Sequence, residues 1–220
     1  MGHKGISIAV NDLFVVFGHT TAVCDATFEV HAGEKVVITG ANGAGKSSVL
    51  RCILGLQAST TGSITVDGRV ARTPHDWQLR RRDIAYVPQR PPSGRFPMSV
   101  QELLQSSGGN DVAVRAEQLG VASLLRQSVS TLSGGQLQRC FIARALMQVD
   151  EGATALLADE PTSALDFEGQ ESVAAILTSL PATLIVVTHE REMVARCDRS
   201  FEMAGGQLRV ATLPSGAGPR

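Results

Sequence analysis

The chain has 220 residues with a formal net charge of −1, and 43% of its residues are hydrophobic while only 4% are aromatic. The balanced charge argues against a nucleic-acid partner and against binding to an anionic membrane surface. No apolar run approaches the roughly 18 residues of a spanning helix, and the first residues lack the apolar core of a signal peptide. We therefore expect an aliphatic-rich α/β protein of the cytosol, with its four scattered cysteines reduced.

The first strands are predicted without helices between them. Residues 6–14 and 27–30 favour extended structure, and the lack of an intervening helix predicts that they pair antiparallel. A β-branched run at 35–39 predicts a buried strand. Phe17 lies between the first two strands, where its ring would either stack on a nucleotide base or pack in the core.

A glycine-rich loop follows the strand at 35–39. It reads Gly40-Ala41-Asn42-Gly43-Ala44-Gly45-Lys46-Ser47, which fits the phosphate-binding pattern G-x-x-x-x-G-K-[ST]. Apolar residues on one face of 47–54 predict the helix that this motif requires. Glycines let several backbone N–H groups point at one anion, and the helix adds the positive end of its dipole. Lys46 is expected to reach the β- and γ-phosphates, and the Ser47 hydroxyl to bind Mg²⁺.

Two further strands are predicted before residue 89. The first covers 61–68 and ends in an Asp-Gly turn, and the second covers 84–87 and is closed by Pro88. Between them, the three arginines at 80–82 are interpreted as the solvated end of a helix.

The next part of the chain predicts an inserted group of helices. Residues 90–97 contain three prolines and one glycine, which indicates an irregular loop. Ser99 and Glu102 fit a capping box that begins a helix through residue 105, and a second helix is expected at 112–119. We therefore predict a separate helical lobe over 90–148.

A second helix start that could bind an anion lies at 132–136, which reads Leu-Ser-Gly-Gly-Gln. Ser133 is expected to cap this helix, and the two glycines allow close approach of another backbone.

Polar residues follow two later buried strands. The strand at 153–158 ends in Asp159 and Glu160, which in a P-loop protein suggests a metal-organising aspartate and a water-orienting glutamate. After a helix at 167–180, the strand at 183–187 is followed by His189. Alternating helices and apolar strands predict a parallel sheet with ligands at the strand ends.

These motifs come in the order of an ATP-binding cassette (ABC) ATPase, which the chain resembles from about residue 6 to residue 210. The resemblance rests on the P-loop, the LSGGQ run, the paired acids, the Ser-Ala-Leu-Asp run at 163–166 and the late histidine. It implies an α/β fold: a P-loop NTPase (RecA-like) core with an N-terminal antiparallel β-subdomain and an inserted α-helical subdomain. It also implies one ABC ATPase domain over 1–220, made of a nucleotide-binding α/β lobe (6–89 and 149–210), a helical lobe (90–148) and a frayed tail (211–220).

The resemblance implies two cofactors, ATP and Mg²⁺, and assigns residues to each. Phe17 takes the place of the aromatic residue that stacks on adenine. The Walker A motif, which would bind ATP, comprises Gly40, Ala41, Asn42, Gly43, Ala44, Gly45, Lys46, Ser47 and Ser48. The metal ion would be held by Ser47, Gln89 and Asp159.

The remaining roles concern catalysis and the subunit interface. Glu160 resembles the base or water-polarising carboxylate, His189 the switch near the γ-phosphate, and Gln89 the γ-phosphate sensor; Lys46 joins them as a catalytic residue. Signature residues, which would close on the γ-phosphate of a partner subunit, are Ser133, Gly134, Gly135 and Gln136. Asp166 resembles the D-loop acid at the same interface.

One copy of each motif implies a head-to-tail homodimer with two shared ATP sites, because this family completes each site from two subunits. With no spanning helix in the sequence, we expect a separate multi-span permease, an extracytoplasmic solute-binding protein in the same system, and a peripheral position on the cytoplasmic face of the membrane. Phe96 and Met98 would contact the permease or fold back into the core of their own lobe.

The segment 89–100 is similar to ATPases of the zinc/manganese/iron importers. This similarity predicts ATP-driven import of a divalent metal ion such as zinc or manganese. The alternatives are the ATPase of an exporter, the ATPase of an importer of another solute, or an ABC ATPase outside transport. Proteins of the last class usually carry tandem cassettes or long coiled-coil insertions, and the sequence has neither.

Overall fold

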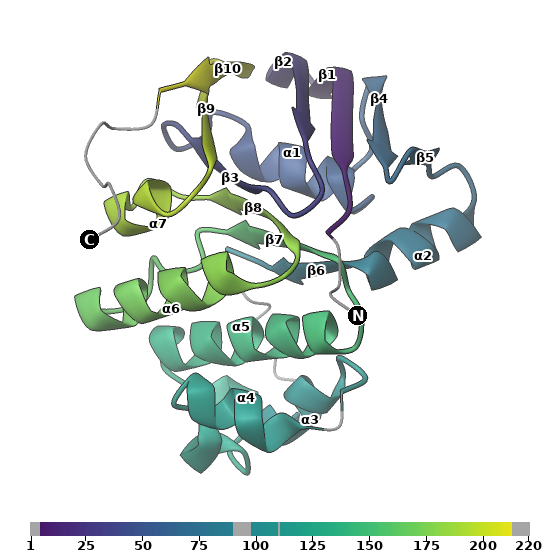
Figure 1. Cartoon of the computed structure of the whole chain (residues 1–220). Helices are drawn as coiled ribbons and strands as arrows, with labels where there is room; N and C mark the ends of the chain where they lie inside the picture. The colour runs from purple at the N-terminus through teal and green to yellow at the C-terminus, as the bar shows by residue number, and fades with distance from the viewer. Residues whose placement is uncertain (1–4, 90–97, 110, 213–220) are drawn as a thin grey trace.

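A computed structural model describes residues 5–89, 98–109 and 111–212 and arranges them as two β-sheets with helices between and below them (Figure 1). The strands are β1 (Ile8–Phe17), β2 (Thr20–Val30), β3 (Lys35–Thr39), β4 (Thr61–Val66), β5 (Arg69–Val70), β6 (Ile84–Val87), β7 (Ala155–Asp159), β8 (Thr183–Val187), β9 (Arg199–Ala204) and β10 (Gln207–Ala211). The α-helices are α1 (Lys46–Ile53), α2 (Pro74–Asp83), α3 (Val100–Gln105), α4 (Val112–Gln118), α5 (Gly134–Asp150), α6 (Phe167–Ser179) and α7 (Arg191–Ala195), and short 3-10 turns are η1 (Ala122–Leu124) and η2 (Val129–Thr131).

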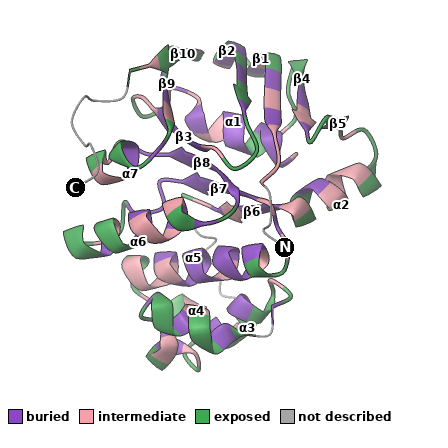
Figure 2. Cartoon of the chain, viewed as in Figure 1, coloured by how far each residue is buried: buried purple, intermediate pink, exposed green. Residues whose placement is uncertain are grey.

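The central sheet has the strand order β10-β9-β3-β8-β7-β6. All neighbouring pairs are parallel except β9 with β10, which form an antiparallel hairpin. Strands β7 and β8 are buried along their whole length (Figure 2), as expected of parallel strands covered on both faces. This arrangement confirms the parallel sheet predicted from the apolar strands.

Alternate residues of the central strands enter two separate cores. In β3, Val37 faces a lower core shared with α5 and α6, while Val36 and Ile38 face an upper core shared with α1 and the antiparallel sheet. The alternation follows from the period of two in a strand. Both faces of the sheet are therefore covered.

The second sheet is antiparallel and has the order β2-β1-β4-β5. The antiparallel pairing predicted for the first two strands is confirmed, with Ile8 opposite Val30 and Val10 opposite Phe28. The predicted Asp-Gly turn joins β4 to β5, and both Asp67 and Gly68 have positive φ angles, as the tight turn of a hairpin requires.

Helices α3, α4 and the first part of α5 form the predicted helical lobe below the central sheet (Figure 1). The capping box predicted at Ser99 is present, because Ser99 N–H donates to the Glu102 carboxylate at 2.7 Å and Glu102 N–H donates to Ser99 Oγ at 3.2 Å. Within the described ranges, no helix combines the length and the hydropathy needed to cross a bilayer.

The interpretation of the arginine run as a solvated helix end is wrong for Arg80, which is only 5% exposed. Its guanidinium lies over the Trp77 ring and donates to the carbonyl oxygens of Ile53, Ile64 and Arg69. Burial lowers its pKa, although the nearby Asp76 carboxylate opposes this effect. Arg80 therefore joins α2 to α1 and to the β4–β5 hairpin.

Candidate functional site

The glycine-rich loop connects β3 to α1 in a conformation that L-residues rarely adopt. Gly40 and Gly45 have φ angles of 136° and 106°. A Cβ atom on Gly40 would lie 2.1 Å from the Met203 carbonyl oxygen, and one on Gly45 would lie 2.0 Å from that of Ala22. Glycine is therefore required at both positions by the backbone angle and by the neighbouring chain.

Lys46 is the first residue of α1, and its side chain folds back over the loop. Its ammonium group donates to the carbonyl oxygens of Gly40 at 2.7 Å and Ala41 at 2.9 Å. The charge is thus held over the curled backbone, where a phosphate would also meet the N-terminus of α1.

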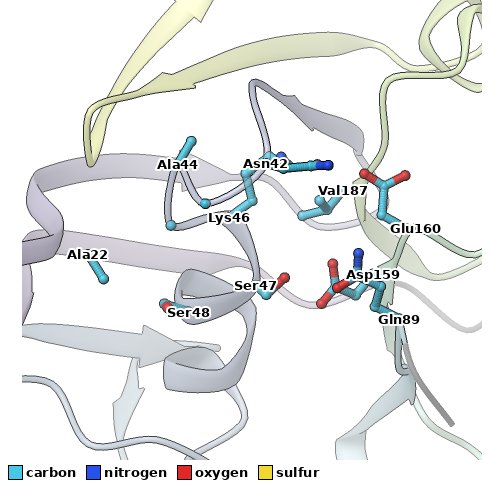
Figure 3. A pocket seen from close by; sticks show the side chains of 12 residues that line it. Ala22, Asn42, Ala44, Lys46, Ser47, Ser48, Gln89, Asp159, Glu160 and Val187 are labelled. Atoms are coloured by element: carbon cyan, nitrogen blue, oxygen red, sulfur yellow. The ribbon is translucent and has the colours of Figure 1, made fainter. Parts of the chain in front are cut away.

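A cavity of about 340 Å³ lies against this loop (Figure 3). It is lined by Ala22, Asn42, Gly43, Ala44, Gly45, Lys46, Ser47, Ser48, Gln89, Asp159, Glu160 and Val187. We call it the phosphate cavity. Most of the P-loop meets Gln89, Asp159 and Glu160 here because β3, β6 and β7 end at the same edge of the sheet. Ala22 and Val187 were not predicted, and no motif in the sequence marks them.

Asp159 and Glu160 are both buried at the end of β7. Within the described structure, neither carboxylate oxygen of Asp159 has a hydrogen-bond partner, and Glu160 Oε2 has none either. Burial raises the pKa of Asp159, and the nearby Ser47 hydroxyl and the charges of Arg51 and Lys46 oppose that rise. Unpartnered buried carboxylate oxygens beside a serine hydroxyl fit the oxygen ligands that Mg²⁺ takes in proteins.

Glu160 and His189 come from neighbouring strand ends and lie together. Glu160 has a positive φ of 49°, and its N–H donates to the Val187 carbonyl at 2.8 Å. His189 Nδ1 lies 3.4 Å from Glu160 Oε2, although 73% of the histidine side chain is exposed. A strained backbone at a polar residue often accompanies function.

The signature residues lie around a different cavity, also of about 340 Å³. Ser133 caps α5 as predicted, since Gln136 N–H donates to its hydroxyl at 3.3 Å. This signature cavity is lined by Gly120, Val121, Ser123, Leu124, Ser133, Gly135, Gln136, Arg139, Ala164, Leu165 and Asp166. None of these residues lines the phosphate cavity. One chain therefore brings the predicted site residues together in two separate groups.

Some predicted residues line neither cavity. Gly134 and His189 are among them, and so is Phe17, which is the last residue of β1. Phe17 is 52% exposed, so the interpretation that its ring packs in the core is wrong. Stacking of this ring on a base stays a prediction.

Comparisons with known proteins agree with this geometry. A family model described as ABC transporter matches residues 23–163. The chain is 36% identical over 202 residues to a probable syringafactin export ATP-binding/permease protein, SyfD, of Pseudomonas syringae, covering 85% of this chain and 30% of that protein. It is 34% identical over 217 residues to the methionine import ATP-binding protein MetN of Brucella abortus, covering 91% of this chain and 58% of that protein.

The chain thus spans between about a third and about three fifths of the length of these curated relatives. Among solved structures, it resembles the dimeric post-hydrolysis state of the ATP-binding cassette MJ0796 bound to ADP and Pi. The TM-score is 0.81 at 26% identity, and the match covers 95% of this chain and all of that one.

Proposed function

This chain belongs to the ABC transporter family and is an ABC ATPase, and on that premise we propose that its ATP hydrolysis energises the movement of an organic solute through a permease domain or subunit. The observation that carries the ATPase part is the phosphate cavity, where Lys46, Ser47, Gln89, Asp159 and Glu160 converge from three strand ends. The predicted P-loop lysine, the three predicted metal ligands and the predicted catalytic carboxylate all line it.

Each residue of the phosphate cavity has a role in this proposal. The glycine-rich backbone and Lys46 bind the phosphates, and Ser47, Asp159 and Gln89 would hold Mg²⁺, which neutralises charge that develops on the phosphate oxygens. Glu160 accepts a proton from, or orients, the attacking water. His189 lies beside Glu160, and its exposed imidazole can reach the γ-phosphate of a bound ATP.

We place the complete site between two chains. The signature cavity holds Ser133 and Gly135 but none of the phosphate-cavity residues, so the two groups in one chain do not form a single pocket. A head-to-tail dimer would set the signature cavity of one chain over the phosphate cavity of the other. The likeness to a dimeric cassette supports this arrangement.

We propose that the permease docks in a third cavity, of about 370 Å³, between the two lobes. This cavity, the interlobe groove, is lined by Leu54, Leu56, Arg81, Ile84, Tyr86, Pro88, Phe141, Arg144 and Gln148. It adjoins Pro88, the residue before Gln89, and it holds a buried amide oxygen of Gln148 that has no partner within the described residues. A largely apolar groove with one unused acceptor suits an amphipathic helix.

We propose the interlobe groove, and not Met98, as the contact with the permease. That side chain is partly buried against the lower core, so of the two predicted outcomes it follows the one in which it folds into its own lobe. Phe96 lies outside the described residues.

The experiment that tests coupling compares two equally exposed apolar residues. Leu56 in the groove and Val114 on α4 are each 57% exposed. Leu56→Asp should leave the ATPase rate of the isolated chain within about twofold, because surface substitutions away from special features rarely disturb a fold. It should abolish co-purification with the permease and stimulation of ATPase by it in vesicles. Val114→Asp should change neither, and loss of coupling by both variants, or by neither, would refute the groove assignment.

The comparisons favour an organic solute over a metal ion. The two relatives are named for syringafactin export and methionine import, and neither name includes a metal. The chain is the ATPase of an exporter or of an importer of such a solute; a solute-binding protein belongs to the system only if it imports.

Deletion of the gene tests the solute class. In a strain with no other zinc or manganese uptake system, cells that lack this chain should grow as well as the parent in chelator-treated medium. They should instead differ from the parent in accumulation of organic compounds, measured by comparing cell extracts and culture medium by mass spectrometry. Poor growth that added zinc or manganese restores would reinstate metal import.

A further inference from the structure

Two loops at the ends of β7 and β8 meet beside the phosphate cavity. Residues 160–166 follow β7, and residues 188–190 follow β8. The backbone N–H of Glu160 donates to the carbonyl of Val187, the last residue of β8, and the Thr162 hydroxyl donates to Glu190 Oε2. The backbone bond is available to any sequence, whereas the second bond depends on these two side chains.

The loop after β8 is anchored on both sides of His189. Thr188 is buried, and its hydroxyl accepts a hydrogen bond from Glu190 N–H at 3.2 Å. Glu190 is half-buried and is the N-cap of α7, where its carbonyl accepts from Val194 N–H at 3.1 Å. The exposed imidazole of His189 is therefore carried on a segment held by backbone atoms of Glu190, to which the carboxylate of Glu190 adds the bond to Thr162.

The loop after β7 connects the two cavities. It begins at Glu160 in the phosphate cavity and ends at Asp166 in the signature cavity. Ser163 bonds back to the Glu160 carbonyl through its N–H at 3.3 Å and its hydroxyl at 3.0 Å, and Leu165 N–H donates to the Thr162 carbonyl at 3.0 Å. Thr162, which is almost fully buried, therefore sits near the middle of a closely hydrogen-bonded segment.

We propose that Glu190 is a positioning residue for ATP hydrolysis. The Glu190 carboxylate accepts a hydrogen bond from the Thr162 hydroxyl and so fixes the His189 backbone against the loop that carries Glu160. This contact sets the 3.4 Å distance between His189 Nδ1 and Glu160 Oε2. The same bond ties the His189 loop to the segment that leads to Asp166. The inference rests on the proposed roles of Glu160 and His189.

Loss of the hydrogen bond between Thr162 and Glu190 should affect the rate of ATP hydrolysis but not the binding of ATP. Neither Thr162 nor Glu190 lines the phosphate cavity, so ATP should bind normally when their bond is lost. Hydrolysis should slow, because small displacements of catalytic groups are costly. A residue that merely supports the fold would lower the measured rate only in proportion to the fraction of chains that is unfolded, whereas a positioning residue lowers the rate of each folded, ATP-binding chain.

The test removes the bond from either side in the full-length chain. Thr162→Val and Glu190→Ala should each lower kcat at least about tenfold, the lower range for losing a hydrogen bond to a charged group. KM and the Kd for a fluorescent ATP analogue should stay within about twofold, because binding contacts are retained. The double variant should be no slower than the slower single variant, since both remove one interaction.

Conservative variants and a neighbouring acid serve as controls. Thr162→Ser and Glu190→Gln keep a donor and an acceptor and should restore most of kcat, whereas Glu192→Ala, in the first turn of α7, should change nothing. Thermal unfolding is measured for every variant. If Thr162→Val does not fold, the comparison of Glu190→Ala with Glu190→Gln decides the matter, because both retain Thr162.

The outcomes separate this inference from the proposed function. Additive losses in the double variant, a loss confined to ATP affinity, or an unchanged kcat in folded Glu190→Ala would each overturn the role of Glu190. If those results came with a Glu160→Gln variant that no longer hydrolyses ATP, the ATPase assignment would stand. If Glu160→Gln hydrolysed ATP normally, the proposed catalytic roles would fail first.

Discussion

Replacing Glu160 with Gln is expected to lower the rate of ATP hydrolysis by a factor of about 10² or more, the usual range for losing a catalytic acid–base group. The side chain is buried at the rim of the phosphate cavity, and its Oε2 atom has no hydrogen-bond partner among the described residues. An amide has the same shape but cannot take up a proton. Binding of ATP with Mg²⁺ should therefore survive.

Slow hydrolysis with intact binding should also trap the ATP-bound dimer. Size-exclusion chromatography with and without ATP measures this directly, and a phosphate-release assay measures turnover. Glu151→Gln, which changes an exposed acid at the far end of α5, is the matched control and should behave like the parent chain. Parental turnover by Glu160→Gln would remove Glu160 from the catalytic role.

The central strands could be predicted from sequence because burial leaves a strong local signal. The runs at 35–39, 84–87 and 183–187 match β3, β6 and β8 at their observed bounds. Each is short and apolar because the sheet is covered on both faces. The P-loop was equally easy to predict, because its glycines, lysine and serine lie close together in the sequence and the strand and helix around them have clear patterns.

The arginine run was interpreted as a helix end, but the extent of helix α2 was not predicted because the helix has no apolar stripe. Its capping box, formed by Thr73 and Asp76 with Pro74 between them, was the available signal. The burial of Arg80 had no local signal at all, because the three carbonyl groups that accept its hydrogen bonds come from other elements of the chain.

The contacts between the loops that follow β7 and β8 could not be predicted from the sequence either. Thr162 and Glu190 are 28 positions apart, and their hydrogen bond exists only because β7 and β8 are neighbours in the sheet. Strand order is a property of the whole fold, so no window of sequence contains it. The prediction of metal import gained no support. The solute is not expected to touch this chain, so the sequence holds no residues that select it.

Mixed dimers that split two lesions between chains are expected to regain activity that neither homodimer has. Lys46→Ala removes the ammonium group that spans the P-loop backbone. Gly135→Asp places a negative charge in the signature cavity, where even a Cβ atom would lie 2.9 Å from the Ala164 carbonyl oxygen. Each homodimer should be inactive, because every shared site contains one lesion.

The arrangement of the lesions then decides where the site lies. When the two substitutions are on different chains, the intact P-loop of one chain faces the intact signature of the other, and activity should return to at most about half per dimer, since one of two equivalent sites is whole. When both substitutions are on one chain and its partner is unaltered, each shared site has one lesion and the dimer should be inactive. A site contained within a single chain predicts the reverse pair of results, because the unaltered chain would then work alone. Two affinity tags isolate each mixed dimer, circular dichroism checks that Gly135→Asp is folded, and the two dimers carry the same substitutions in total. Any difference between their hydrolysis rates therefore comes from the pairing of cavities across the interface.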